Sequence, residues 1–301
     1  MKTELIKRVS KLMLLLLIVF FFNSCGRKTD ITIGTKNFTE QIILGEIMAE
    51  LIANQLGLKV KKRFNLGGTF ICFNALKQGE IDLYPEYTGT GLTAILKKPV
   101  INDNMKVYEI VKKNFKENYG LLWLKPFGFN NTYTITMRKS QAGKLHLTKI
   151  SDLKKHMGKL RTGFTSEFFE REDGLKGLKK AYELSFKIKP KELDPGLMYK
   201  AIKENEVDVI CGFATDGRIP AYDLQILQDD KHFFPPYYAA PVLRDNVLKK
   251  HPALEPILNK LYNLISDLEM SRMNYNVDQE GRKASDVANE FLHKHKLLKG
   301  E

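Results

Sequence analysis

The chain has 301 residues, of which 43% are hydrophobic and 28% are charged, and its formal net charge is +13. This composition excludes a disordered chain, and the length suffices for one large domain or two of ordinary size. The positive charge first suggests nucleic acid or an anionic membrane surface as a partner. Acidic residues alternate with the basic ones, however, and no zinc-finger or basic-zipper pattern is present, which favours a lysine-rich solvated surface.

The N-terminus has the pattern of an export signal. Basic residues precede an uninterrupted apolar run over 12–22. These eleven residues are too few to span a bilayer, which takes about 20, whereas a basic segment before a short apolar core is typical of a signal peptide. Cys25 follows this core and resembles the cysteine of a bacterial lipobox, which becomes lipidated as the new N-terminus. We therefore predict a lipoprotein signal peptide over 1–24, with an ordinary secreted protein and a chance cysteine as the alternative.

The spacing of apolar residues predicts an alternation of strands and helices in the first part of the chain. The predicted strands lie over 31–35, 58–64 and 81–84, and the helices between them lie over 37–55 and 67–79. Asn37 and Glu40 have the spacing of a capping box at the start of the first helix. Strands that alternate with helices in this way favour a parallel α/β sheet.

The rest of the chain predicts a second α/β alternation and a helical tail. Helices over 89–96 and 105–118 lead to strands over 121–127 and 132–137 and to a polar loop over 138–147. The second alternation has helices that begin near 151, 170–174 and 195, and strands over 160–163, 186–188, 207–211 and 224–227. From 247 onward the chain is predicted to be mostly helical, with helices over 254–264 and 283–293. Two α/β halves with a returning tail indicate two lobes around a cleft.

The stretch from Tyr84 to Leu92 combines two tyrosines, a proline and two glycines at the end of a predicted strand. Ligands bind at the carboxyl edge of open α/β sheets. Tyr87 is our candidate for one wall of an aromatic box around a quaternary ammonium group. Such a group has no N–H to donate, and a ring face attracts it by roughly 0.5–2 kcal/mol. The alternative from residue type alone is that Tyr84 and Tyr87 are ordinary packing tyrosines.

Other motifs give little support to an enzyme or a metal site. The G-x-G-x-x-A pattern over 89–94 lacks the clean strand and the acidic residue that a dinucleotide site needs. Carboxylates at 80, 82 and 86 could pair as catalytic acids, but acidic residues around a strand end are more often solvated. Ser166 lacks a nucleophile-elbow setting, and the histidines form no metal-ligand pattern. Cys72 and Cys211 lie in apolar contexts that favour buried free thiols, with a disulfide between them left open.

Several multi-residue motifs follow one another after residue 30. They are Ile33-Gly-Thr-Lys-Asn-Phe-Thr-Glu-Gln41, Asn65-Leu-Gly-Gly-Thr69, Leu83-Tyr-Pro-Glu-Tyr-Thr-Gly-Thr-Gly91, Phe129–Tyr133, Phe164–Glu167, Asp194–Tyr199, Thr215–Arg218 and Asp229–Tyr237. Together they resemble the substrate-binding lipoproteins of osmoprotectant ABC importers, which bind glycine betaine, choline, carnitine and related compounds. The resemblance implies an α/β, type II periplasmic-binding-protein fold with two lobes, a ligand cleft and two crossover segments. The implied first lobe covers 30–130 and 236–301, and the second covers 131–235.

The resemblance also implies which residues bind the ligand. The positions that match the family's aromatic box are Tyr87, Tyr133, Phe213 and Tyr237. The backbone carbonyl that touches the ammonium head falls on Asn131, and the groups that hold a betaine carboxylate fall on Lys36, Thr90 and Arg171. Lys36 precedes a helix N-terminus, which favours an anion, and Arg171 can grip a carboxylate with two parallel donors. Phe213 departs from the family, whose members usually carry tyrosine there, because a phenyl ring keeps the π face and loses the hydroxyl.

The sequence thus predicts a receptor and not an enzyme. We expect a lipid-anchored protein of the cell envelope that delivers a quaternary-ammonium solute to a membrane permease and its ATPase, with no metal, no other cofactor and no nucleic acid. The ligand stays open between glycine betaine, choline, carnitine and a larger betaine such as ergothioneine. A secreted enzyme that uses the cleft carboxylates and a basic nucleic-acid binder are the alternatives from other classes.

Overall fold

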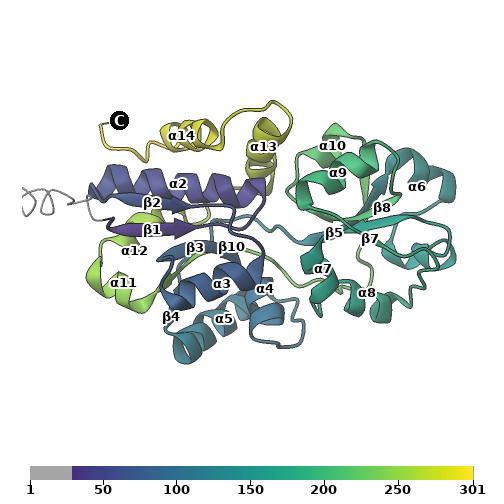
Figure 1. Ribbon diagram of the computed structural model, residues 1–301, viewed down its shortest axis with the longest axis horizontal. Coiled ribbons are helices and arrows are strands. Elements are labelled where there is room, and N and C mark those ends of the chain that lie inside the picture. The colour runs from purple at the N-terminus through teal and green to yellow at the C-terminus, as the bar shows by residue number, and fades with distance from the viewer. Residues whose placement is uncertain (1–28, 301) are drawn as a thin grey trace, which may run out of the picture. The chain divides into compact units, whose positions relative to one another are not determined.

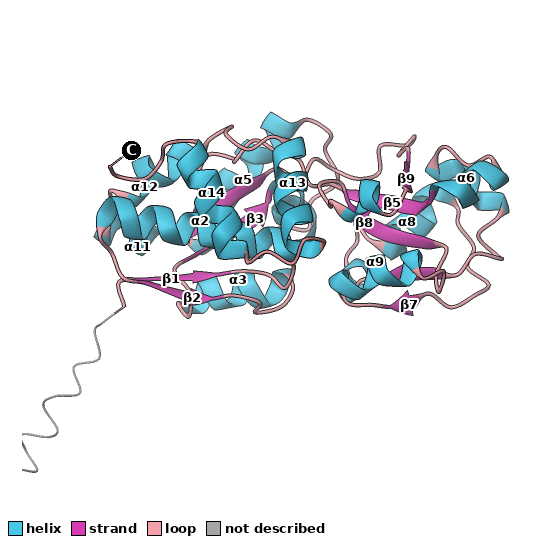
Figure 2. Cartoon of the chain, turned by 90° about the horizontal axis from the view of Figure 1, so that it is seen from above, coloured by secondary structure: helices cyan, strands magenta, loops and turns pink. Residues whose placement is uncertain are grey.

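The computed structural model describes residues 29–300, and those from Ile31 onward form one compact unit. The predicted signal peptide and Cys25 lie outside the described residues. Within the described unit, Figures 1 and 2 show two α/β lobes, each built around its own five-stranded sheet. The early part of the chain and its C-terminal part make up the first lobe, and the middle of the chain makes up the second (Figure 1).

The first sheet has the strand order β2-β1-β3-β10-β4. The strands are β1 (Ile31–Gly34), β2 (Val60–Arg63), β3 (Leu83–Tyr87), β4 (Leu121–Trp123) and β10 (Ala239–Arg244). β1 runs parallel to β2 and β3, whereas β10 lies antiparallel between β3 and β4. The strand that completes this sheet therefore comes from a point in the chain more than 110 residues beyond its neighbour β4.

Helices cover both faces of the first sheet (Figure 1). They are α2 (Thr39–Leu56), α3 (Thr69–Gln78), α5 (Asn104–Tyr119), α11 (Asp245–Lys250), α12 (Leu254–Leu258), α13 (Asp267–Asp278) and α14 (Ala284–Lys294). Side chains alternate across a strand, so Leu83 and Leu243 pack into an apolar cluster with α2, α12, α13 and α14. Tyr84 and Val242 pack on the other face with α3 and α5. The short α4 (Thr88–Thr90) and a π-helical turn over Gly91–Ile95 follow β3 directly.

The second sheet has the strand order β7-β6-β8-β5-β9. The strands are β5 (Tyr133–Arg138), β6 (Thr162–Phe164), β7 (Lys191–Glu192), β8 (Val209–Phe213) and β9 (Leu224–Leu227). Its helices are α6 (Lys139–Leu145), α7 (Ser166–Glu170), α8 (Leu175–Tyr182), α9 (Pro195–Lys203) and α10 (Arg218–Ala221), with a 3-10 turn over Ile150–Lys155. β5 lies antiparallel to both β8 and β9, so the strand that enters this lobe is placed inside the sheet.

The chain passes between the lobes in two segments that lie side by side. Asn130 forms an isolated antiparallel bridge with Tyr238. The backbone N–H of Asn131 donates to the carbonyl of Tyr237 at 3.1 Å, and the hydroxyl of Thr132 donates to the carbonyl of Pro235 at 3.5 Å. The two crossover segments implied by the resemblance are therefore hydrogen-bonded to each other.

Two sequence predictions were wrong in the second lobe. The region predicted as a polar loop over 138–147 contains α6. Ala142 is the one fully buried residue of this short helix, so its sequence has the polar character of a loop. The strand predicted over 186–188 is not formed. Phe186 instead packs edge-on against Phe164 at 6.1 Å between ring centroids, and strand pairing begins later, in β7.

β10 was not predicted at all. It contains Pro241, and a proline argues against a central strand because it has no N–H for the ladder. In the sheet Pro241 lies opposite Pro85 of β3. Two prolines can face each other at a position where an antiparallel pair exchanges no hydrogen bonds, so neither residue leaves a donor missing across this pair.

The predicted capping box at the start of α2 is also wrong. The N-cap residue of this helix is Phe38, which has an extended backbone and no side-chain capping hydrogen bond. Glu40 lies in the first turn of α2 and is only 2% exposed. Its carboxylate accepts hydrogen bonds from distant residues instead of capping the helix.

Asp208 fastens one end of the second sheet. Its carboxylate accepts hydrogen bonds from Arg138 at the end of β5 at 2.8 Å, from Gln141 at 3.1 Å, and from the backbone and guanidinium of Arg161 at 2.9 Å. Burial raises the pKa of Asp208, but the hydrogen bonds from Arg161 and Gln141 and the charge of Arg161 hold it well below its usual range. The ionised carboxylate therefore stabilises the fold.

We expect Asp208→Asn to lower the free energy of unfolding at pH 7 by about 2 kcal/mol, because the charged acceptor of these donors is lost. The folded-state pKa of Asp208 is depressed, so its contribution is present above the unfolded-state pKa, near 3.9, and is lost as the pH falls through the folded-state pKa. Urea unfolding at pH 7 and pH 3 should show a smaller difference between wild type and variant at pH 3. Asp223→Asn is the control, since Asp223 is exposed and has a 3.8 Å ion pair with Lys139. A difference that does not shrink with acid would contradict this role of Asp208.

Candidate functional site

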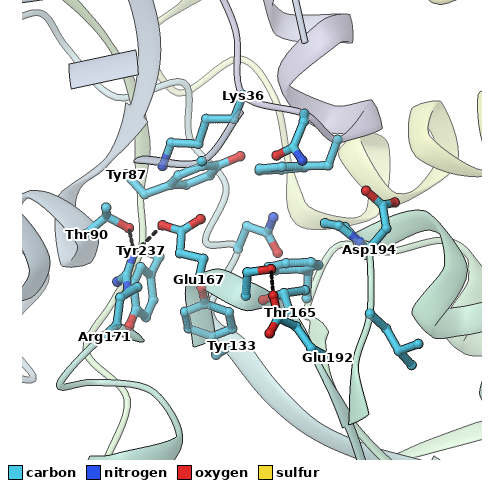
Figure 3. Close-up of a pocket in the computed structure, with 18 residues that line it drawn as sticks. Lys36, Tyr87, Thr90, Tyr133, Thr165, Glu167, Arg171, Glu192, Asp194 and Tyr237 are labelled. Carbon is cyan, nitrogen blue, oxygen red and sulfur yellow. Dashed lines mark hydrogen bonds and ion pairs between the residues drawn. The ribbon is translucent and has the colours of Figure 1, made fainter. Parts of the chain in front are cut away.

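A cavity of about 340 Å³ lies between the two lobes, and all eight ligand-binding residues implied by the sequence line it. They are Lys36, Tyr87, Thr90, Asn131, Tyr133, Arg171, Phe213 and Tyr237. Figure 3 shows the labelled members of this set converging on one hollow from both lobes. The lining also contains residues that the sequence did not single out, namely Phe38, Thr165, Glu167, Glu192 and Asp194.

The aromatic walls are set by strand register. Tyr133 of β5 lies directly opposite Phe213 of β8, and their ring centroids are 5.5 Å apart. The ring of Tyr237 meets that of Tyr133 at 5.6 Å and an interplanar angle of 84°. Phe38 stacks on Phe213 at 5.4 Å and 5°, and its centroid is 6.3 Å from that of Tyr87. Phe38 thus joins the first-lobe tyrosine to the second-lobe walls in one run of rings.

A glycine makes room for the ring of Tyr237. A Cβ atom at Gly89 would lie 2.7 Å from this ring and 2.8 Å from the backbone oxygen of Pro236. Real Cβ atoms do not approach this closely, and the Pro236 oxygen belongs to the backbone. Gly89 belongs to the pattern that resembles a dinucleotide fingerprint, and the structure explains it by the close approach of the second crossover segment.

Glu40 lies behind the aromatic wall and is fully hydrogen-bonded. Its carboxylate accepts from the hydroxyl of Tyr87 at 2.7 Å, the side-chain amide of Asn131 at 2.8 Å and that of Asn274 at 3.1 Å, and also from the hydroxyl of Thr215. Burial raises the pKa of Glu40 against the opposing effect of these hydrogen bonds. This one carboxyl therefore holds Tyr87 and Asn131 in place from behind.

Lys36 is 2% exposed and already has partners within the first lobe. Its Nζ atom lies 2.6 Å from Oε1 of Glu86 and donates to the hydroxyl of Thr69 at 2.7 Å. Glu86 is fully buried, so the interpretation of this carboxylate as a solvated residue is wrong. The same ammonium group lies 5.2 Å from the ring centroid of Tyr87, which places a cation against that wall.

Arg171 forms the corresponding pair within the second lobe. Its Nε and Nη2 atoms donate to the two oxygens of Asp173 at 2.8 and 2.5 Å. Nη1 donates to the hydroxyl of Thr90 at 3.0 Å and to Oε1 of Glu167 at 3.1 Å. Burial raises the pKa of Asp173, but the charge and hydrogen bonds of Arg171 hold it below its usual value. The hydroxyl of Tyr237 also donates to Asp173.

Three of the polar contacts that cross from lobe to lobe beside the cavity use threonine hydroxyls. Thr69, Thr90 and Thr93 of the first lobe contact Glu167, Arg171 and Asp173 of the second lobe, in that order. The ion pairs of Lys36 with Glu86 and of Arg171 with Asp173, in contrast, each lie within a single lobe. Away from the cavity, Arg218 of the second lobe pairs with Asp278 of the first at 3.4 Å. Separation of the lobes would therefore leave the two ion pairs of the cavity intact and break the hydroxyl contacts and the outer Arg218–Asp278 pair.

The residues that sequence reasoning missed include Phe38 and Glu167 of the lining and also Glu40 and Asp173, which bind lining residues from behind. Phe38 and Glu40 lie inside the motif over 33–41, and Glu167 ends the motif over 164–167, so the motifs marked their neighbourhood but not their roles. Asp173 lies two positions after Arg171. An arginine and an aspartate two positions apart were the signal in the sequence for a bidentate ion pair between them.

The two cysteines of the described chain are free and buried. Burial raises the pKa of both Cys72 and Cys211 to about 12, so they pack as small apolar residues, as their sequence contexts favour. Within residues 29–300 no helix combines the length and apolar character needed to cross a bilayer.

Residues 29–294 match the family described as the substrate-binding domain of ABC-type glycine betaine transport systems. The chain is 41% identical over 298 residues to the carnitine transport binding protein OpuCC of Listeria monocytogenes, with 96% of each chain covered. It is 39% identical to the ergothioneine transport permease/ergothioneine binding protein EgtU of Helicobacter pylori, with 87% of this chain and 47% of that protein covered. Among solved structures, a glycine betaine/carnitine/choline ABC transporter protein is similar with a TM-score of 0.73 and 38% identity, with 89% of this chain and 99% of that chain covered.

We expect Gly89→Ala to lower the free energy of unfolding by about 1–3 kcal/mol, because the added methyl group overpacks Tyr237 and the Pro236 backbone. Gly143→Ala is the matched control. Gly143 lies in α6 with no atom within 4 Å of an added Cβ, so this change should stabilise by about 0.5–1 kcal/mol through helix propensity. Chemical denaturation of both variants measures the two effects. Equal shifts of the same sign would refute the close approach at Gly89.

Proposed function

Because this chain belongs to the family of substrate-binding domains of ABC-type glycine betaine transport systems, we propose that it binds a quaternary-ammonium solute between its lobes. The observation that carries this proposal is the run of rings around one cavity, from Tyr87 through Phe38 and Phe213 to Tyr133 and Tyr237. Ring faces attract a permanently methylated nitrogen that cannot donate a hydrogen bond. The ligand classes that this wall suits are glycine betaine, choline and carnitine.

The polar residues of the cavity are suited to bind the part of the ligand that lies beyond its ammonium group. We assign Lys36, Thr90 and Arg171 to this role, and the backbone carbonyl of Asn131 to a contact with the ammonium head. Phe213 keeps a ring face in the wall and has no hydroxyl, so it limits the size of the head group by packing alone. These assignments follow the family motifs, and the common cavity of all these residues supports them.

Ligand capture follows from the two-lobe architecture. We assign 30–130 and 236–301 to one lobe and 131–235 to the other, with the hinge at the paired segments around Asn131 and Tyr237. Rotation about such a hinge opens and closes a cleft around a ligand. Closure brings the threonine hydroxyls of the first lobe to the charged groups of the second, as described above.

A larger betaine is the second candidate ligand. The similarity to an ergothioneine binding protein favours it, whereas a cavity volume of about 340 Å³, at the lower end of the range for small-molecule sites, favours the smaller ligands. Competition binding with glycine betaine, choline, carnitine and ergothioneine separates these ligands. A secreted enzyme in the same cleft would convert a bound compound, and recovery of each ligand unchanged after prolonged incubation would argue against it.

The partners follow from the family. By its family, a substrate-binding protein of an ABC importer acts outside the cytoplasmic membrane with a permease and an ATPase. We propose in addition that residues 1–24 are a lipoprotein signal peptide and that lipidated Cys25 anchors the mature chain to the membrane. The lipid anchor would keep the receptor close to its permease.

We expect Tyr87→Ala to weaken quaternary-ammonium binding at least tenfold, which corresponds to about 1.4 kcal/mol, because one ring face is lost. Tyr87→Phe keeps the ring face and loses the hydrogen bond to Glu40, so it should bind more tightly than Tyr87→Ala. Tyr262→Ala is the surface control, since Tyr262 is 47% exposed. Calorimetric titration with choline and glycine betaine measures the affinities, and melting curves verify that each variant is folded. Unchanged affinity in folded Tyr87→Ala would remove the aromatic wall from ligand binding.

We expect cells that produce the full chain to incorporate radiolabelled palmitate into it, and Cys25→Ser to abolish the label. Cys72→Ser is the matched control, because this thiol is buried in the first lobe and should not affect labelling. The anchor is refuted if the wild-type chain takes up no label, or if the label persists in Cys25→Ser.

A further inference from the structure

The cations that line the cavity are each neutralised by a carboxylate of their own lobe. Lys36 is paired with the fully buried Glu86, and Arg171 is paired with Asp173, which is 2% exposed. Removal of one partner from a buried pair is costly because it leaves an uncompensated charge. Neither cation is therefore an unoccupied anion site of the kind that a ligand carboxylate would fill.

Glu167 is a third carboxylate in the same place. It projects from α7 of the second lobe into the cavity, and its Oε1 atom lies 3.1 Å from Nη1 of Arg171. Across the cleft it accepts a hydrogen bond from the hydroxyl of Thr69, which in turn accepts from Lys36 at 2.7 Å. Figure 3 shows the Glu167 carboxylate between the rings of Tyr87 and Tyr133, on the Arg171 side of the pocket.

This position is where a ligand carboxylate would be expected. It adjoins the N-terminus of the ten-residue helix α3, where Thr69 is the first helical residue, and an added Cβ at Gly68 would lie 3.5 Å from Oε2 of Glu167. Helix N-termini favour negative charge. Burial raises the pKa of Glu167, but the charges of Lys36 and Arg171 and the Thr69 hydroxyl hold it below its usual value. Glu167 is thus an ionised group that occupies the anion side of the site.

The formal charges of this cluster do not cancel. Lys36 and Arg171 contribute two positive charges, whereas Glu86, Asp173 and Glu167 contribute three negative charges, so the cluster has a formal charge of −1. Glu192 and Asp194 add exposed carboxylates at the rim. A ligand with one positive charge and no carboxylate neutralises the cluster. A zwitterionic betaine brings its own carboxylate against Glu167.

We propose that Glu167 is a specificity-determining residue that selects quaternary-ammonium cations with an uncharged tail, such as choline, over carboxylate-bearing betaines. This inference rests on the proposed function of the cavity. Glu167 acts by occupying the region between Arg171 and Thr69, and it can accept a hydrogen bond from a ligand hydroxyl. A betaine carboxylate has to displace it or be repelled by it.

The test compares the ratio of the dissociation constants of glycine betaine and choline in wild type and in Glu167→Gln. The amide has the same shape and no charge, so the ratio should change at least tenfold in favour of glycine betaine, which corresponds to about 1.4 kcal/mol. Glu167→Asp keeps the charge and should retain the preference for choline. Glu172→Gln is the matched control, since Glu172 is 72% exposed and pairs with Lys176 outside the cavity, and it should leave the ratio unchanged.

The outcomes separate this inference from the proposed function. If wild type binds both compounds and Glu167→Gln leaves their ratio within threefold, the selective role of Glu167 is overturned while the binding function stands. The same conclusion follows if Glu167→Asp shifts the ratio as far as Glu167→Gln, because charge is then not the cause. If wild type binds neither compound nor carnitine, the proposed function fails and the inference fails with it. Melting curves of the variants verify that each is folded.

Discussion

The site depends on the rule that a buried charge needs a partner. Lys36 and Arg171 are 2% and 3% exposed, and an isolated ion at such depth would cost several kcal/mol. Glu86 and Asp173 supply the opposite charges at 2.6 and 2.5 Å. Because these pairs are complete, the cations are held at fixed places beside the rings of Tyr87 and Tyr133, 5.2 and 5.4 Å from their centroids. In each lobe the charged groups are thus held beside that lobe's aromatic wall.

The division of contacts between the lobes has a physical consequence. The ion pairs of Lys36 and Arg171 each belong to one lobe, and three contacts that cross the cleft beside them pass through the hydroxyls of Thr69, Thr90 and Thr93. Away from the cavity, Arg218 of the second lobe forms an ion pair with Asp278 of the first at 3.4 Å. Separation of the lobes therefore breaks this outer pair and the hydroxyl contacts, but it preserves the buried pairs that neutralise Lys36 and Arg171. Glu40 adds a contact of the same kind behind the wall, through the Thr215 hydroxyl.

The sequence predicted the fold most successfully where apolar spacing is regular. The alternation at the start of the chain predicted β1, α2, β2 and α3 to within a few residues. It failed where tertiary contacts override local preference. β10 was not predicted, and its Pro241 lies opposite Pro85 of β3, so neither proline leaves a donor missing across that pair. Phe186 lies in a stretch that alternates apolar and basic residues, and its ring packs against that of Phe164 instead of belonging to a strand.

By itself the sequence determined eight of the residues that line the cavity, because their motifs follow the family order and all eight meet at one hollow. Only the tertiary structure decided how they are partnered. Lys36 meets Glu86 across 50 positions, Thr69 meets Glu167 across 98, and Asn274 meets Glu40 across 234. Local periodicity reports which face of a helix or strand is buried. It does not report which distant charge or hydroxyl the fold brings within hydrogen-bond distance, and in this protein those pairings set the charge of the site.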